Sequence, residues 1–155
     1  MAEHHLPFGA PASGSLRVSR EYVLRLASEA RSSIAFVSKI VERPFEALSG
    51  AERYAIRYHL IAIAEALASI ALHVCRNLLN QRPETPIHAF RLLAEKDVIS
   101  NEVFMELSKF VRLRNLLVHR YWVVDDEKVY EGIKRDFKCV ERFLEDVLAL
   151  IGGGV

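Results

Sequence analysis

The feature that most constrains the fold is a long, mostly apolar segment in the middle of the chain. Ser49-Gly50-Ala51-Glu52 has the capping-box pattern that begins a helix, with a serine followed three residues later by a glutamate. Helical periodicity then continues to about Leu79, and the middle of this segment is apolar on most sides. We expect a helix of this kind at the centre of a bundle, because other helices must cover it.

The same segment does not fit a membrane span well, since its most apolar part, residues 60–75, is short and contains Glu65 and His73. Residues 1–15 are rich in Pro, Gly, Ala and Ser, and they lack the charged start and apolar core of a signal peptide. We therefore expect a cytoplasmic protein with a buried central helix.

The composition is that of one ordinary soluble domain. A chain of 155 residues with 51% hydrophobic residues can bury a substantial core. The net charge of +1 means that any nucleic-acid site must be a local basic patch, because the whole molecule has no strong field. Cys75 and Cys139 lie in apolar helical contexts without metal-ligand spacing, so we expect reduced thiols instead of a disulfide.

Periodicity and capping residues predict four helices besides the central one. They extend over residues 19–42, 87–95, 101–121 and 127–151. Pro44 ends the first, because a proline disfavours the helical conformation of the residue before it. Ser100 is the expected cap of the third, and Asp125 or Asp126 the expected cap of the last.

No alternating pattern is long enough for a sheet, and the chain contains no internal repeat. The predicted fold is therefore all-α, an up-and-down bundle of four long helices plus one short helix. Residues 1–16 are expected to be a flexible N-terminal leader, residues 17–151 the helical domain and residues 152–155 a C-terminal tail.

Polar residues suited to chemistry gather at the end of the helix expected over residues 101–121. At about 100° per residue, Arg114, Asn115, His119 and Tyr121 fall on one side of this helix. The opposite side carries apolar residues that face the core: Phe110, Leu113 and Leu117. The polar residues are therefore not needed for packing.

These residue types fit the cleavage of RNA by its own 2′-hydroxyl, which needs a base, an acid and cations around the phosphorus. Histidine can transfer protons near neutrality, and arginine matches phosphate oxygens with a charged fork. Tyr121 could bind a phosphate or hold the histidine, and Asn115 could orient His119 one helical turn away. No metal or other cofactor is implied, because the motif has no carboxylate cluster.

A homodimer would solve a geometric difficulty in this site. Arg114 and His119 are expected about 140° apart around one helix, which is awkward for gripping a single phosphate. Two copies of the helix across a two-fold axis would bring two arginines and two histidines around one cleft.

Each candidate also has a plainer interpretation. His119 could be a cation favoured by a helix C-terminus, and Arg114 a solvated or ion-paired side chain. Tyr121 could close the end of the bundle. Arg112 and Arg120 flank the motif and could contact the RNA backbone, or they could form a solvated face.

Glu65 lies within an apolar run and therefore needs a partner. It could support the motif as an anchor for Arg114 or as a group that orients His119. It could instead form a structural pair with Arg57 or Arg76, and the sequence leaves both possibilities open.

The string Arg-Asn-x-x-x-His-x-Tyr at residues 114–121 resembles the signature of the HEPN superfamily, in particular its HepT-like branch. Residues 52–66 resemble that family's long second helix. Residues 83–93 and 98–100 resemble its short helix and the turn before the motif helix. The resemblance covers roughly residues 17–151.

The resemblance implies a metal-independent endoribonuclease that acts as a dimer and is the toxin of a HepT/MntA-type toxin–antitoxin pair. The implied partner is a minimal nucleotidyltransferase that inhibits the toxin by attaching AMP to the motif tyrosine, here Tyr121. The alternatives are a non-catalytic helical partner or substrate-binding subunit of such a nucleotidyltransferase, and a generic ligand-binding or signalling bundle. The complete motif favours the enzyme.

Overall fold

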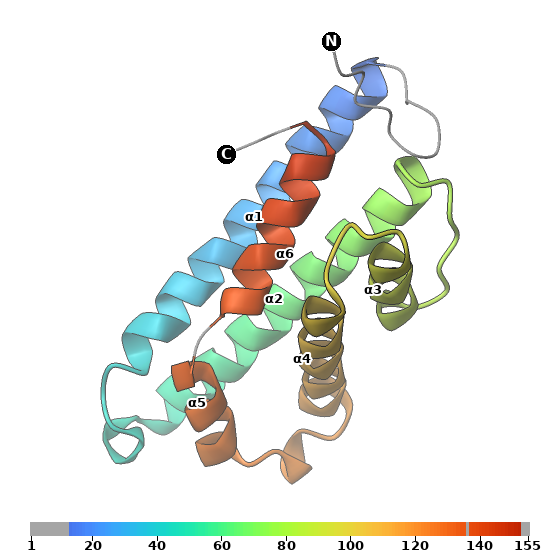
Figure 1. The fold of residues 1–155 in the computed structure, drawn as a ribbon. Helices are drawn as coiled ribbons and strands as arrows, with labels where there is room; N and C mark the ends of the chain where they lie inside the picture. Colours follow the sequence, from blue (N-terminus) through green and yellow to red (C-terminus); the bar gives the residue numbers. More distant parts are fainter. Residues whose placement is uncertain (1–12, 136, 153–155) are drawn as a thin grey trace.

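The computed structural model describes residues 13–135 and 137–152, and within them the fold is helical, without a strand (Figure 1). The helices are α1 (Ser13–Ile40), α2 (Gly50–Asn77), α3 (Pro86–Glu95), α4 (Asn101–His119), α5 (Asp126–Arg135) and α6 (Lys138–Leu150). Two short 3₁₀ helices, η1 (Phe45–Ala47) and η2 (Tyr121–Val123), follow α1 and α4. The predicted all-α fold is confirmed.

Helix α2 is the centre of the molecule, as expected. Helix α1 lies along it, and α3 and α4 also pack against it (Figure 1). By length and composition α2 could cross a membrane, but 50% of its apolar window is buried under the other helices. Large buried side chains such as Leu60, Leu67 and Ile70 make it the core helix of a bundle.

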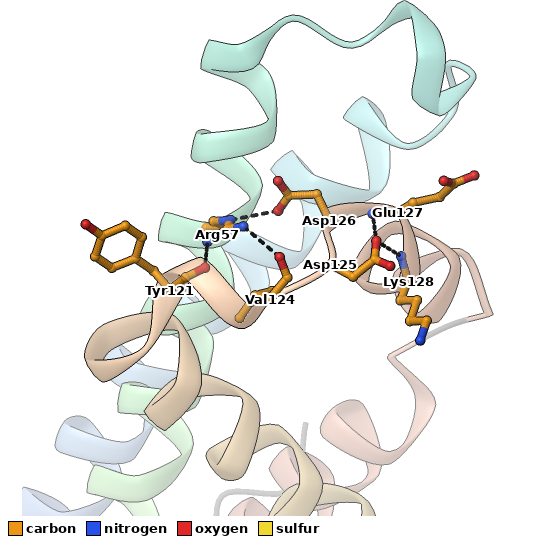
Figure 2. Close-up of polar contacts among 7 residues, drawn as sticks. All are labelled: Arg57, Tyr121, Val124, Asp125, Asp126, Glu127 and Lys128. Atoms are coloured by element: carbon orange, nitrogen blue, oxygen red, sulfur yellow. Dashed lines mark hydrogen bonds and ion pairs between the residues drawn. The ribbon is translucent and has the colours of Figure 1, made fainter.

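The predicted caps explain where the helices begin. The Ser49 hydroxyl accepts a hydrogen bond from the Glu52 backbone N–H, and the Glu52 carboxylate accepts one from the Ser49 N–H, which completes the capping box. The Ser100 hydroxyl accepts from an N–H in the first turn of α4. At α5 the cap is Asp125 and not Asp126, because the Asp125 carboxylate accepts from two backbone N–H groups (Figure 2).

The helix predicted over residues 127–151 is divided in two. Helix α5 ends at Arg135, and α6 begins after Phe137, whose φ of −113° and ψ of 31° depart from helical values. The division lets α5 turn toward the end of α1, where the Tyr130 hydroxyl donates to the carbonyls of Val41 and Arg43. Helix α6 packs instead against α1 and α4. Local apolar spacing could not reveal this change of direction.

The structure can also be compared with the predicted bounds of the domain at its two ends. Helix α1 begins at Ser13, before the predicted start and within the expected leader, whose residues 1–12 lie outside the described part of the chain. At the other end, Gly152 has a φ of +69°, and the expected tail residues 153–155 lie outside the described part.

The two cysteines are free, as predicted. Cys75 is fully buried in α2, and its burial raises the pKa of the thiol to about 11. Cys139 is half-buried in α6. Both therefore belong to the packing of the bundle.

Candidate active site

The guanidinium of Arg114 is held by Glu65. Arg114 Nε lies 2.6 Å and Nη2 lies 2.5 Å from Oε1 of Glu65, so the ion pair joins α4 to the central helix. Of the partners that the sequence left open for Glu65, the structure selects Arg114. Arg57 pairs with Asp126 instead.

The same guanidinium also contacts Asn115, whose Oδ1 accepts from Arg114 Nη1 at 3.1 Å. In the described residues no hydrogen bond joins Asn115 to His119, so the orientation of His119 by Asn115 stays a prediction. Nη1 and Nη2 of Arg114 each carry a second N–H, for which no acceptor lies among the described residues, and the side chain is 29% exposed. Arg114 is thus fixed in position while keeping donors for a ligand.

His119 is the last residue of α4, and its side chain is exposed. Arg120 follows it with a φ of −142° and a ψ of 45°, which ends the helix before the predicted position near Tyr121. The imidazole therefore stands at the end of the motif helix, open to solvent. This exposure is what a proton-transfer group needs if its substrate arrives from outside.

Tyr121 does not lie on α4, so its expected position on the polar side of that helix is wrong. It begins η2, its side chain is 59% exposed, and its ring meets that of Trp122 edge-on at 5.3 Å. The phenol points away from the bundle (Figure 2). A hydroxyl in this position is accessible to a second protein.

Sequence reasoning missed the role of Arg57, which it considered only as a partner for Glu65. Its guanidinium contacts the segment after α4 at three points, Asp126, the Tyr121 carbonyl and the Val124 carbonyl (Figure 2). The signal for this contact is absent from the sequence, since the partners lie more than sixty residues away along the chain.

Apolar side chains are exposed around the end of the motif helix. In α4 and η2 they are Leu116, Val118, Tyr121, Trp122 and Val123. In α2, Tyr54 and Tyr58 are 69% and 67% exposed, three residues before and one residue after Arg57 in the sequence. Large exposed apolar groups gathered in one region are typical of an interaction surface.

Basic side chains accompany this apolar surface. Arg112 and Arg120 are both exposed, and with Arg114 they give the C-terminal half of α4 and the residue after it a local positive character on a nearly neutral molecule. Their contact with RNA remains a prediction.

Comparison with known proteins shows the family of this chain. A family model described as "Ribonuclease HepT-like" matches residues 23–147. The chain belongs to the HepT-like ribonuclease family. The match includes α2, which carries Glu65, and the whole motif from Arg114 to Tyr121.

One characterised HepT protein shows a low sequence identity to this chain. The mRNA nuclease HepT of Shewanella oneidensis is 29% identical over 85 residues, which are 55% of this chain and 64% of that protein. The chain therefore spans less than two thirds of this curated relative.

Solved structures share the fold. A mutant MntA–HpeT toxin–antitoxin structure has a TM-score of 0.74 at 21% identity, covering 83% of this chain and 98% of the other. The tri-AMPylated Shewanella oneidensis HEPN toxin in complex with the MNT antitoxin has a TM-score of 0.65 at 21% identity, covering 85% and 95%. YutE, a cytosolic protein of unknown function from Bacillus subtilis, has a TM-score of 0.73 at 16% identity, covering 88% and 94%. These similarities confirm the HEPN-like bundle.

Proposed function

We propose that this HepT-like protein is a metal-independent endoribonuclease and the toxin of a cytoplasmic toxin–antitoxin pair. One observation carries the proposal above all. Arg114, fixed by Glu65, lies one and a half turns before an exposed His119 on the same helix, in a chain that belongs to a ribonuclease family.

The proposed reaction uses the nucleophile that RNA itself supplies. A neutral imidazole of His119 removes the proton of the 2′-hydroxyl, whose oxygen attacks the adjacent phosphorus. A protonated imidazole donates a proton to the leaving 5′-oxygen. The products are a 2′,3′-cyclic phosphate and a 5′-hydroxyl, so no water or metal-bound nucleophile enters the first step.

Arg114 would stabilise the phosphorane between these two proton transfers. The guanidinium is already positioned by Glu65 and Asn115, so less side-chain freedom is lost when a phosphate binds. Its remaining N–H groups can then donate to the phosphate oxygens, which become more negative in the transition state. Arg112 and Arg120 would contact neighbouring phosphates.

The reaction needs a base and an acid together, whereas each chain has one motif histidine. A homodimer related by a two-fold axis would supply both from two copies of His119. The exposed apolar side chains at the end of α4 support this arrangement, since Val118 and Trp122 would be covered by a second copy.

Regulation would act on Tyr121. Its phenol is exposed beside the motif helix, so a minimal nucleotidyltransferase could transfer AMP to the oxygen. The product would carry bulk and a negative phosphodiester into the phosphate site and would repel RNA. The similar Shewanella oneidensis HEPN toxin was solved in a tri-AMPylated form with its MNT antitoxin, which supports this proposal.

The deciding experiment compares wild-type protein with His119→Ala, both purified without the partner, on total RNA in the presence of EDTA. We expect wild type to leave cyclic phosphate ends, and His119→Ala to lose about 10²- to 10⁴-fold in rate. His88→Ala, in α3, is the control and should keep full activity. Equal rates for wild type and His119→Ala would refute the nuclease mechanism and favour a non-catalytic subunit of a nucleotidyltransferase.

A further inference from the structure

Arg57 makes three polar contacts with one short stretch of chain. Its Nε donates to Oδ1 of Asp126 at 2.7 Å, Nη1 donates to the Tyr121 carbonyl at 2.8 Å, and Nη2 donates to the Val124 carbonyl at 3.2 Å. Figure 2 shows the guanidinium between α2 and the segment that joins α4 to α5. The Arg57 side chain is only 14% exposed, and its contacts with Asp126 and Val124 are partly buried.

Within one protomer, η2 adds little to the attachment of this segment to the bundle, although Val124, which follows η2, packs against the core. Tyr121, Trp122 and Val123 are 59%, 67% and 47% exposed, so their side chains contribute little burial. The backbone bonds within η2, from Val123 N–H to the Arg120 carbonyl and from Val124 N–H to the Tyr121 carbonyl, are local. Local bonds shape the turn but do not fix its position relative to the bundle.

The chemistry of the contact requires an arginine. Asp126 fixes the plane of the guanidinium through Nε, and this leaves Nη1 and Nη2 to donate to two carbonyls at once. A lysine ammonium is a single charged point and could preserve the pair with Asp126 without reaching both carbonyls in the same geometry.

We propose that Arg57 is a positioning residue for the motif, which holds the backbone of Tyr121 and thereby fixes the phenol beside the end of α4. Arg57 does not touch the reacting groups and acts through the carbonyls of Tyr121 and Val124. The structural half of this proposal, that Arg57 keeps η2 ordered, does not depend on any enzymatic activity. Its effect on RNA cleavage rests on the proposed nuclease function.

The first test uses Trp122, which is the only tryptophan of the chain and lies next to Tyr121 in η2. Its fluorescence anisotropy reports the order of this segment without any enzymatic activity. We expect Arg57→Gln to lower the anisotropy while circular dichroism shows the same helix content. The matched control is Arg31→Gln, which breaks another arginine–carboxylate pair between helices, to Glu141, and should leave the anisotropy unchanged.

Arg57→Lys tests whether the segment is held by the three hydrogen bonds of the guanidinium or by its positive charge alone. We expect this variant to keep most of the thermal stability but to show the low anisotropy of Arg57→Gln, because a lysine cannot donate to both carbonyls in the same geometry. Restoration of the wild-type anisotropy by lysine would overturn the proposal. Size-exclusion chromatography of the same samples ensures that they share one oligomeric state.

If Arg57→Gln does not fold, Asp126→Asn is the second variant, since it weakens the contact that orients Nε. We expect it also to lower the anisotropy of Trp122, and a wild-type value would overturn the proposal.

The kinetic test distinguishes positioning from RNA binding. We expect Arg57→Lys to lower kcat for RNA cleavage about 10- to 100-fold while KM changes little, because the segment that begins two residues after His119 would no longer be held in place. Raised KM at unchanged kcat would contradict a positioning role. Inactive wild-type protein would refute the nuclease proposal alone, because the anisotropy result would still stand.

Discussion

Arg114 of α4 and Glu65 of α2 form an ion pair across 49 residues of sequence, with Arg114 Nε 2.6 Å from Glu65 Oε1. Glu65 lies in the middle of the central helix α2, but its side chain is 51% exposed, so it meets Arg114 at the surface of the bundle and not in the core. The pair also links the motif to the rigid centre of the bundle. Disturbing Glu65 therefore tests whether the position of Arg114 matters.

Glu65→Gln should lower RNA cleavage about 10- to 100-fold, because Arg114 loses the charged partner that holds it. Initial rates on a defined RNA would measure this effect. Glu141→Gln removes the partner of Arg31 at another helix contact and should keep the wild-type rate. An unchanged rate for Glu65→Gln would leave the pair with a structural role only.

Tyr121→Phe should abolish modification by the partner nucleotidyltransferase, because the variant lacks the phenolic oxygen that would accept AMP. Intact-mass spectrometry after co-expression would show a gain of one or more adenylyl groups on wild type and none on the variant. Tyr58→Phe is the control, since Tyr58 is 67% exposed, close to the 59% of Tyr121. A mass gain on Tyr121→Phe would place the acceptor elsewhere.

Val118→Lys should weaken the proposed dimer, because it puts a charge into an apolar surface that a second copy would cover. Light scattering after size-exclusion chromatography would show a shift toward the monomer mass. Met105→Lys is the control, because Met105 is also an exposed apolar residue of α4 but lies about 140° around the helix. A monomeric wild-type protein would exclude the composite site.

The protein should lose stability as the pH falls below about 6.5. His73 Nδ1 accepts from Asn77 Nδ2, which also donates to the His73 carbonyl, and His73 Nε2 faces the Ser19 hydroxyl, so the fold binds the neutral imidazole. Burial lowers the pKa of His73 and of His59 below the usual 6.5.

Below that value the unfolded chain binds protons that the folded chain does not, so unfolding becomes more favourable with acid. Above it the contribution is constant. Thermal melts between about pH 8 and about pH 5 would show a falling Tm, and His73→Gln should flatten the decline. A melting temperature that rises toward acid would contradict this account.

Local signals in the sequence predicted much of the fold. The capping box at Ser49 and the cap at Ser100 work over three residues, so they can be recognised without knowledge of the tertiary structure. The same holds for the spacing of Arg114, Asn115 and His119, because α4 is regular up to His119. The position of Tyr121 was wrong because the helix ends first, and nothing in the side-chain pattern marks that end.

The sequence by itself therefore determined the helices, the central place of α2 and the residue types of the site, since these depend on neighbours within a few turns. Only the tertiary structure decided that Glu65 pairs with Arg114 and that Arg57 holds the segment after α4. Both contacts form between side chains that the packing of α2 against α4 brings together, and several arginines had equal claim to Glu65 before that packing was known. The division of the last helix has the same cause, because Tyr130 finds its carbonyl partners at the end of α1.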